Sequence, residues 1–196
     1  MPAEFVRSAE HDEQLPAFVG PEIACIGRSN VGKSSLLNRL FKTHQLVRTS
    51  KTPGRTQLLN VFQYEHVFFV DLPGYGYAKM SQEGRAGMDS RVENYFKNRE
   101  NLSAVWLLID ARHPEGMDRD ASMVSWFRAH NREFTLIFTK IDCVSKTKRL
   151  IHVRKLEQFF SVRSGSALLF SAKTGEGRDK LLKLMHDLKK TAHLGV

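Results

Sequence analysis

The sequence predicts an α/β fold in which a mostly parallel sheet of six strands is covered by helices on both faces. Short apolar runs recur between longer segments whose apolar residues repeat with the 3.6-residue period of a helix. Most of these runs are apolar throughout, as strands are when both faces of their sheet are covered. Only a short turn around Glu65 separates the second run from the third, too little chain for a crossover helix, so we predict one antiparallel hairpin there.

Each element follows from its own stretch of sequence. We predict strands at 22–27, 58–64, 66–71, 104–110, 134–140 and 167–173. We predict helices between and after them at 33–42, 82–99, 118–130, 146–161 and 177–190. In the last helix one apolar stripe, which we expect to pack in the core, consists of Leu181, Leu184, Met185 and Leu188. The segments 43–57 and 72–82 show no sustained period, and long irregular loops of this kind are commonly functional.

Composition limits the class of protein. The 196 residues are 41% hydrophobic, and we expect a single domain over 21–196 after a loosely held leader over 1–20. No apolar run approaches the roughly 20 residues that span a bilayer, and acidic residues occur where a signal peptide would be basic and then apolar. We therefore expect a cytoplasmic protein with no stable membrane association. Cys25 and Cys143 form no CxxC pair, which argues against a zinc site or a disulfide framework and predicts two reduced thiols.

The net charge of +9 is concentrated in the C-terminal third, where residues 140–196 hold 13 Lys and Arg against 5 Asp and Glu. The cations gather along two predicted helices: Lys146, Lys148, Arg149, Arg154 and Lys155 on one, and Lys180, Lys183, Lys189 and Lys190 on the other. We expect Val153, Leu156 and Phe160 to face the core, so that the cations of the first helix point outward. A solvated helix face and an anionic partner explain this charge equally well.

One glycine-rich motif follows the first predicted strand and opens the first predicted helix. It matches G-x-x-x-x-G-K-[ST] and consists of Gly27, Arg28, Ser29, Asn30, Val31, Gly32, Lys33 and Ser34. Its glycines let successive backbone N–H groups turn toward a phosphate, and the positive end of the helix dipole adds to their attraction. Lys33 is then suited to reach the β- and γ-phosphates of a nucleotide, and the Ser34 hydroxyl to bind Mg²⁺.

A second motif ends the third predicted strand and consists of Asp71, Leu72, Pro73 and Gly74. An acid that ends a strand beside a phosphate loop is suited to hold the shell of a Mg²⁺ ion, commonly through water. Gly74 has no side chain, so its N–H can approach a γ-phosphate and let the following loop sense whether that phosphate is present.

Two motifs at later strand ends predict which base is bound. Thr139, Lys140, Ile141 and Asp142 follow the fifth strand, and Phe170, Ser171 and Ala172 lie at the end of the sixth. The Asp142 carboxylate can accept from both donors on the N1/N2 edge of guanine, which adenine lacks, while the stem of Lys140 lies over the base. The Ala172 N–H can donate to guanine O6. Because open α/β sheets bind ligands at these strand ends, we predict a site for GTP and GDP.

Three stretches, GRSNVGKSS (27–35), KTPGRTQ (51–57) and DLPGYGYAK (71–79), resemble the EngB family of bacterial ribosome-biogenesis GTP-binding proteins, within the translation-factor class of P-loop GTPases. The resemblance runs from about Phe5 to about Leu188. It implies a Ras-like P-loop GTPase fold that hydrolyses GTP to GDP and phosphate, with Lys33, Thr56 and Gly74 as the catalytic residues.

The resemblance also implies that Thr56 coordinates Mg²⁺ in the GTP-bound state, together with Ser34 and Asp71. Further nucleotide contacts are then expected from the residues around it, which are Gly54, Arg55, Gln57 and Leu58. The resemblance further implies a cellular role in assembly of the large ribosomal subunit, contact with ribosomal RNA, and a link to normal cell division and septation. We expect a monomer.

Some positions depart from common GTPase patterns. Thr139 stands where many GTPases have Asn, and Cys143 stands where family members often carry Lys. Tyr75 directly follows Gly74, where Ras-like switches place a water-orienting Gln, so we expect slow unaided hydrolysis. Asn30 resembles the asparagine that binds K⁺ in potassium-stimulated GTPases, although a loop-stiffening hydrogen bond explains it equally well. For Tyr77, packing of its loop onto the next helix is as good an explanation as a functional role.

Two other function classes are consistent with parts of this pattern. A phosphate-loop kinase would want an arginine-rich lid and no guanine-reading motifs, so the motifs at 139–142 and 171–173 argue against it. A GTP-dependent protein-binding switch that acts in septation without touching RNA stays an alternative.

Overall fold

The computed structural model describes residues 2–43, 46–47, 58–75, 90–99, 101–112 and 117–192, with the backbone alone for 189–192. Within them, one sheet of seven strands runs in the order β1-β3-β4-β2-β5-β6-β7. The strands are β1 (Glu4–Ala9), β2 (Glu22–Gly27), β3 (Leu59–Tyr64), β4 (Val67–Asp71), β5 (Leu102–Asp110), β6 (Thr135–Thr139) and β7 (Leu168–Leu169). β4, β2, β5, β6 and β7 pair in parallel, whereas β3 is antiparallel to both of its neighbours.

The hairpin predicted from the short second connection is confirmed. Tyr64 of β3 pairs with Val67 of β4, and Glu65 between them has a φ of +56°. A positive φ of this kind lets a tight turn reverse the chain without a crossover helix.

A helix also lies in each predicted helical segment. The helices are α1 (Lys33–Phe41), α3 (Ser90–Asn98), α4 (Asp118–Ala129), α5 (Arg149–Phe159) and α6 (Arg178–Ala192), and two 3₁₀ turns cover Asp12–Gln14 and Ile141–Cys143. Residues 82–89, the first part of the helix predicted at 82–99, lie outside the described residues. α5 begins three residues later than predicted, so Lys146 precedes it.

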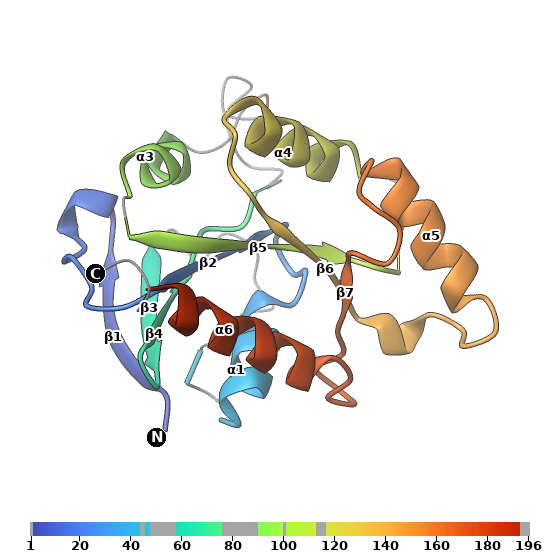
Figure 1. Ribbon diagram of the computed structural model, residues 1–196, viewed down its shortest axis with the longest axis horizontal. Coiled ribbons are helices and arrows are strands. Elements are labelled where there is room, and N and C mark those ends of the chain that lie inside the picture. Colours follow the sequence, from blue (N-terminus) through green and yellow to red (C-terminus); the bar gives the residue numbers. More distant parts are fainter. Residues whose placement is uncertain are drawn as a thin grey trace.

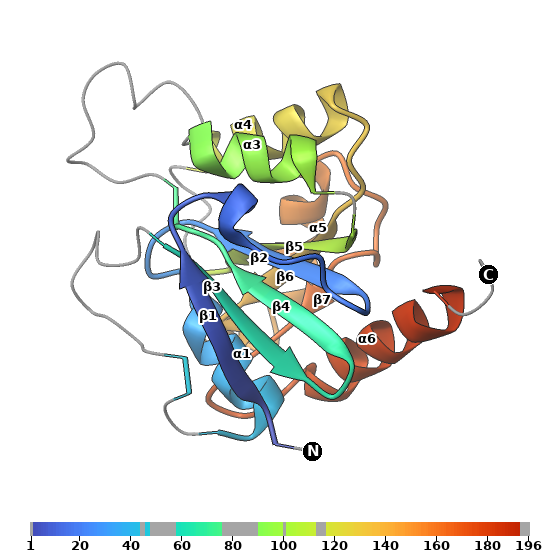
Figure 2. The ribbon, with the colours of Figure 1, turned by 90° about the vertical axis from the view of Figure 1, so that its left-hand side faces the viewer.

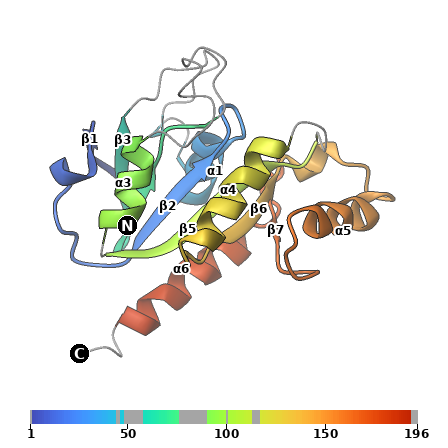
Figure 3. The same ribbon diagram turned by 90° about the horizontal axis from the view of Figure 1, so that it is seen from above.

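Helices cover both faces of the sheet, which explains why every residue of β2 is buried. α3, α4 and α5 lie on one face, and α1 and α6 lie on the other (Figure 1, Figure 3). Tyr95 and Phe127 fill the first layer. In the second layer Leu181 and Met185 of the predicted α6 stripe are fully buried, while Leu184 and Leu188 pack against its margin.

The N-terminal residues correct the sequence prediction, which treated residues 1–20 as a loosely held leader and counted six strands. β1 adds a seventh strand by pairing with β3 at one edge of the sheet (Figure 2). Leu15 and Phe18 are buried in the same core, and the ring of Phe18 stacks on Phe68 at 4.3 Å. Five of the six residues of β1 are exposed, so this edge strand lacks the apolar run by which the other strands were recognised.

A buried ion pair fastens this N-terminal segment to the sheet. The Arg99 side chain donates to the Glu22 carboxylate at 2.9 Å, and the Tyr95 hydroxyl donates to the other carboxylate oxygen. The same guanidinium donates to the carbonyl of Pro16 and lies 4.7 Å from the centre of the Phe18 ring. Burial raises the pKa of Glu22, and the bonds from Tyr95 and Arg99 act against that increase.

None of the helices in the described part of the chain is both long and apolar enough to cross a membrane. Cys25 is buried, Cys143 is exposed, and both are free thiols, as predicted.

Candidate functional site

The glycine-rich loop runs from the end of β2 into α1, as predicted. Gly32 has a φ of +109° and Asn30 a φ of +62°, both in the left-handed region that this tight turn requires. A Cβ at Gly27 would lie only 2.6 Å from the carbonyl oxygen of Leu108 in β5, so only glycine fits there. The Val31 N–H donates to the Arg28 carbonyl at 3.1 Å, which closes the turn before Lys33 opens α1.

The segment from Asp71 to Tyr75 lies directly against this loop. A Cβ at Gly74 would lie 3.0 Å from the backbone nitrogen of Ser29, so the absence of a side chain allows this close approach. The Ser29 N–H donates to the carbonyl of Tyr75 at 3.2 Å, and Arg28 and Tyr75 form an isolated parallel bridge. The two motifs are therefore joined through their backbones by residues 46 positions apart in the sequence.

Asp71 is a buried carboxylate at the end of β4. Its Oδ1 atom is inaccessible to solvent and has no hydrogen-bond partner within the described ranges. Burial raises the pKa of Asp71, and the positive charge of Lys33 opposes that shift. An orphaned buried oxygen beside a lysine and a phosphate loop suits a divalent cation. The described residues contain no cluster of three or more metal-binding side chains.

Thr139 and Lys140 connect the end of β6 to the glycine-rich loop. The Thr139 hydroxyl contacts two backbone carbonyls, that of Val31 at 2.7 Å and that of Ile109 at 3.1 Å. The shorter threonine side chain, noted above as a departure from Asn, therefore still reaches the loop. The Lys140 ammonium donates to the Asn30 carbonyl at 2.6 Å, so its stem crosses toward the loop.

Asp110 was missed as a site residue, although it ends the strand predicted at 104–110. Its carboxylate accepts from Lys140 at 2.7 Å and from Arg112 at 2.8 Å. Burial acts in the opposite direction, but these hydrogen bonds lower the pKa of Asp110 to about 2. The ionised carboxylate thus holds Lys140 in place at neutral pH.

The two predicted base-reading loops meet at Asp142 and Ser171. The buried Ser171 hydroxyl donates to the Asp142 carboxylate at 2.5 Å, and the Thr174 N–H donates to the same hydroxyl at 3.1 Å. The hydrogen bond from Ser171 lowers the pKa of Asp142, which keeps it an acceptor. Ile141 and Phe170 are buried, the Ile141 N–H donates to the Phe170 carbonyl at 3.2 Å, and Ala172 is half-buried.

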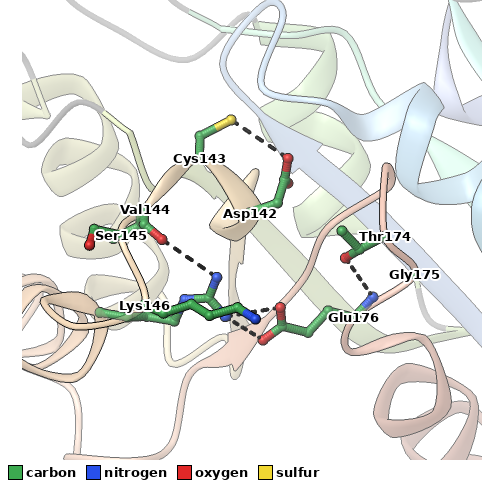
Figure 4. Close-up of a pocket in the computed structure, with 9 residues that line it drawn as sticks. Asp142, Cys143, Val144, Ser145, Lys146, Thr174, Gly175 and Glu176 are labelled. Carbon is green, nitrogen blue, oxygen red and sulfur yellow. Dashed lines mark hydrogen bonds and ion pairs between the residues drawn. The ribbon is translucent and has the colours of Figure 1, made fainter.

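A hollow of about 730 Å³ lies between these loops and is lined by residues 142–146, 149 and 174–176. Asp142 and Cys143 lie on one side of it, and Thr174, Gly175 and Glu176 lie on the other (Figure 4). The Cys143 thiol contacts the Asp142 carboxylate at 3.7 Å. The cysteine that departs from the family pattern therefore lies at the rim of the predicted base site without displacing Asp142.

The sequence prediction was wrong about Arg149, which it grouped with the cations that point outward. Its side chain is only 18% exposed and pairs with Glu176 at 2.9 Å. Val153, Leu156 and Phe160 are buried as predicted, and Lys146, Lys148, Arg154 and Lys155 are exposed. Because Arg149 and Glu176 lie far apart in the sequence, no local pattern could have paired them.

Asp120 at the start of α4 was also missed. It is buried, accepts a hydrogen bond from the Tyr75 hydroxyl at 2.7 Å, and lies 3.8 Å from the Arg28 guanidinium. Tyr75, which stands in the place of a water-orienting glutamine, is thus fixed to α4. Burial raises the pKa of Asp120 to about 6, although the hydrogen bond from Tyr75 and the charge of Arg28 act against it.

Not every predicted site residue can be placed. Gly54, Arg55, Thr56, Gln57 and Tyr77 lie outside the described residues. Leu58 is half-buried immediately before β3, and Leu72 and Pro73 are buried between Asp71 and Gly74.

Comparison with known proteins agrees with this geometry. The family model described as 50S ribosome-binding GTPase matches residues 22–140. The chain is 44% identical over 185 residues to the probable GTP-binding protein EngB of Pelotomaculum thermopropionicum, and the match covers 93% of each chain. It is 44% identical to the protein of the same description from Desulfatibacillum aliphaticivorans, over 95% of this chain and 91% of that relative.

Among solved structures, the crystal structure of a probable GTP-binding protein engB matches the fold with a TM-score of 0.71 at 24% identity. That match covers 87% of this chain and 99% of the solved one. The resemblance found in the sequence motifs is therefore confirmed, and the chain belongs to the EngB family of GTP-binding proteins, which are GTPases with a P-loop α/β fold.

Proposed function

We propose that this GTPase is a cytoplasmic molecular switch that binds GTP, hydrolyses it slowly, and acts in assembly of the large ribosomal subunit. The nucleotide assignment depends on one observation: the motif loops meet at the C-terminal ends of the strands. Ser29 joins the phosphate loop to the 71–75 segment, Thr139 joins that loop to the end of β6, and Ser171 joins the two base-reading loops. The link to cell division and septation is supported by family resemblance alone.

In this proposal each group has one task. The backbone of residues 27–34 surrounds the phosphates, and Lys33 neutralises the charge between the β- and γ-phosphates. Asp142 accepts from the N1 and N2 donors of guanine, the Ala172 N–H donates to O6, and the stem of Lys140 covers the base. Gly74 lets the backbone of the 71–75 segment approach the γ-phosphate, as it already approaches Ser29.

The same residues fit a Mg²⁺ ion. Mg²⁺ prefers oxygen ligands and usually keeps several waters beside one or two protein groups and the substrate phosphates. The unpartnered Oδ1 of Asp71 and the Ser34 hydroxyl at the start of α1 supply such oxygens. When bound, the ion offsets negative charge that develops on the phosphates. Thr56, the third proposed ligand, lies outside the described residues.

Exposed cations support a contact with ribosomal RNA. Arg154 and Lys155 lie on the outer face of α5, Lys148 lies just before that helix, and Lys180 and Lys183 are exposed on α6. The family's description as 50S ribosome-binding adds support for the large subunit as the source of that RNA. GTP should strengthen docking because loops that contact the γ-phosphate are ordered in that state.

Co-sedimentation with purified large subunits, in the presence of a non-hydrolysable GTP analogue and across a salt series, tests the RNA contact. Each phosphate contact adds about 0.7–0.9 to the log-log slope of affinity against salt. The double variant R154A/K155A should lower that slope by about 1.5, whereas R7A/K97A, which removes two exposed charges elsewhere, should leave it unchanged. Equal slopes for R154A/K155A and wild type would contradict RNA contact by α5.

One observation favours the alternative of a GTP-dependent protein-binding switch. Leu150 and Ile151 are each 62% exposed on α5, and aliphatic side chains bury well against protein but do not stack on bases. Under this alternative, capture of a partner from lysate with the GTP analogue would survive ribonuclease, and the variant L150S/I151S would abolish it. Loss of capture on ribonuclease treatment would favour the RNA contact.

A further inference from the structure

Besides the Ser171–Asp142 hydrogen bond, the side chain of Arg149, which belongs to neither loop, also joins the two base-reading loops. One terminal nitrogen of the Arg149 guanidinium donates to both oxygens of the Glu176 carboxylate, at 2.9 and 3.0 Å. The other donates to the carbonyl of Ile141 at 2.9 Å, which is the residue before Asp142. Arg149 therefore contacts the 139–142 loop and the 170–176 loop at the same time.

Glu176 is itself built into the turn that carries Ala172. Its carbonyl accepts from the Ser171 N–H at 3.0 Å, and its own N–H donates to the Thr174 hydroxyl at 3.3 Å. The Gly175 N–H donates to the Ser171 carbonyl at 2.9 Å, which closes the turn from the other side. The Glu176 backbone is therefore hydrogen-bonded on either side of Ala172, while its carboxylate bonds to Arg149.

The site is partly shielded from water. The Arg149 side chain is 18% exposed and the Glu176 side chain 41% exposed, and both line the hollow beside Asp142. A guanidinium presents donors in a rigid plane and so can serve a carboxylate and a carbonyl together, whereas a lysine ammonium is a single point on a flexible stem.

We propose that Arg149, through Glu176, is a positioning residue for guanine selectivity. It fixes the distance between the Asp142 carboxylate and the Ala172 N–H, which meet opposite ends of one base edge. The proposal rests on the proposed assignment of Asp142 and Ala172 to guanine. Guanine makes three contacts, with N1–H and the 2-amino group at Asp142 and O6 at Ala172, and it gains from all three only if the two loops keep a fixed separation and orientation. Loosening the loops therefore penalises guanine more than a base that makes only two of these contacts.

Hypoxanthine provides that comparison because it keeps N1–H and O6 but lacks the 2-amino group. Calorimetry with the full-length chain would measure the affinities for GDP and inosine diphosphate (IDP) in wild type, R149A, R149K and E176Q. We expect the preference for GDP over IDP to fall about tenfold in R149A and nearly as far in R149K, because a lysine cannot serve both loops. E176Q keeps the shape of the side chain but weakens the pair, so its preference should fall less.

Arg163→Ala, which removes an exposed arginine just after the same helix, is the matched control and should leave the preference unchanged. A merely structural role for Arg149 would lower both affinities by the same factor or lower only the melting temperature, and either result would overturn the proposal. R149K and E176Q keep the test open if R149A fails to fold, since a wild-type preference in both would also overturn it.

Asp142→Asn separates failure of this proposal from failure of the base assignment. If D142N keeps the wild-type preference for GDP over xanthosine diphosphate, the assignment of Asp142 is wrong and the role of Arg149 is overturned with it. If D142N reverses that preference while the Arg149 variants keep the wild-type ratio of GDP to IDP affinity, only the positioning role is overturned.

Discussion

The hydroxyl of Tyr75 donates a 2.7 Å hydrogen bond to the carboxylate of Asp120, a residue 45 positions later at the start of α4. The Arg28 guanidinium lies 3.8 Å from the other oxygen of that carboxylate. Asp120 thus connects the phosphate loop, the residue after Gly74, and a helix on the outer face of the sheet. Tyr75 therefore has a structural hydrogen-bond partner at the position where Ras-like switches have a glutamine that orients the attacking water.

Asp120 should make stability depend on pH. Its pKa is raised from the usual 3.8 to about 6, so protonation favours the folded chain, and this contribution is lost as pH rises through about 6. Asn cannot titrate. Between pH 4 and pH 8, the unfolding free energy of wild type should therefore fall by about 2 kcal/mol relative to that of D120N. Urea titrations across this range measure the difference, and parallel curves for the two proteins would refute it.

Arg99 should be essential to the fold because its loss leaves Glu22 charged and buried. Glu22 is fully buried and Arg99 is 11% exposed. Removing one partner of a buried pair typically costs about 3–5 kcal/mol, so we expect R99A to lose that much unfolding free energy. The double variant E22Q/R99A removes the buried charge and should recover part of the loss. A loss of less than about 1 kcal/mol of unfolding free energy in R99A would contradict the proposal that this ion pair holds the N-terminal segment to the sheet.

Ser34 and Thr56 should respond differently to the γ-phosphate. Ser34 lies in the first turn of α1 and is proposed to stay beside the nucleotide in both states, whereas Thr56 is proposed to bind Mg²⁺ only when GTP is present. We expect S34A to weaken GDP and a GTP analogue alike, and T56A to weaken only the analogue, by about tenfold. Equal losses for the two nucleotides on T56A, measured by calorimetry with Mg²⁺, would exclude the switch role.

Potassium should accelerate hydrolysis through Asn30. Asn30 is exposed, and its backbone carbonyl accepts a hydrogen bond from the Lys140 ammonium at 2.6 Å. This bond fixes the backbone from which the Asn30 side chain extends. A monovalent cation there would supply positive charge near the phosphates, worth about tenfold or more in rate. Turnover in KCl and NaCl at equal ionic strength measures it, with N30A expected to remove the difference. Identical wild-type rates in the two salts would leave Asn30 a structural role alone.

The fold was predictable where one local signal sufficed. Strands covered on both faces are apolar throughout, as in β2, and α6 shows its stripe at Leu181 and Met185. β1 was not predictable in this way because an edge strand is held by backbone hydrogen bonds to β3 and buries only one of its six side chains.

The same distinction applies to the site. Motif residues such as Gly27, Lys33 and Asp142 could be identified because a phosphate and a base impose local spacing. Arg149 and Asp120 act on loops that reach them only through the fold, so their sequence neighbourhoods carry no sign of the contact. The placement of Arg149 among outward cations failed because periodicity predicts a helix face but not a partner on another loop.

Guanine recognition by Asp142 is the central claim, and the affinity of D142N for GDP and xanthosine diphosphate tests it most directly. The Asn amide presents an NH2 donor where Asp presents a second acceptor oxygen, so it disfavours the 2-amino donor of guanine and favours xanthine, which carries a carbonyl oxygen at that position. Calorimetry should show wild type preferring GDP and D142N preferring xanthosine diphosphate, with a change in selectivity on the order of 10⁴-fold. Unchanged GDP affinity in D142N would contradict the account.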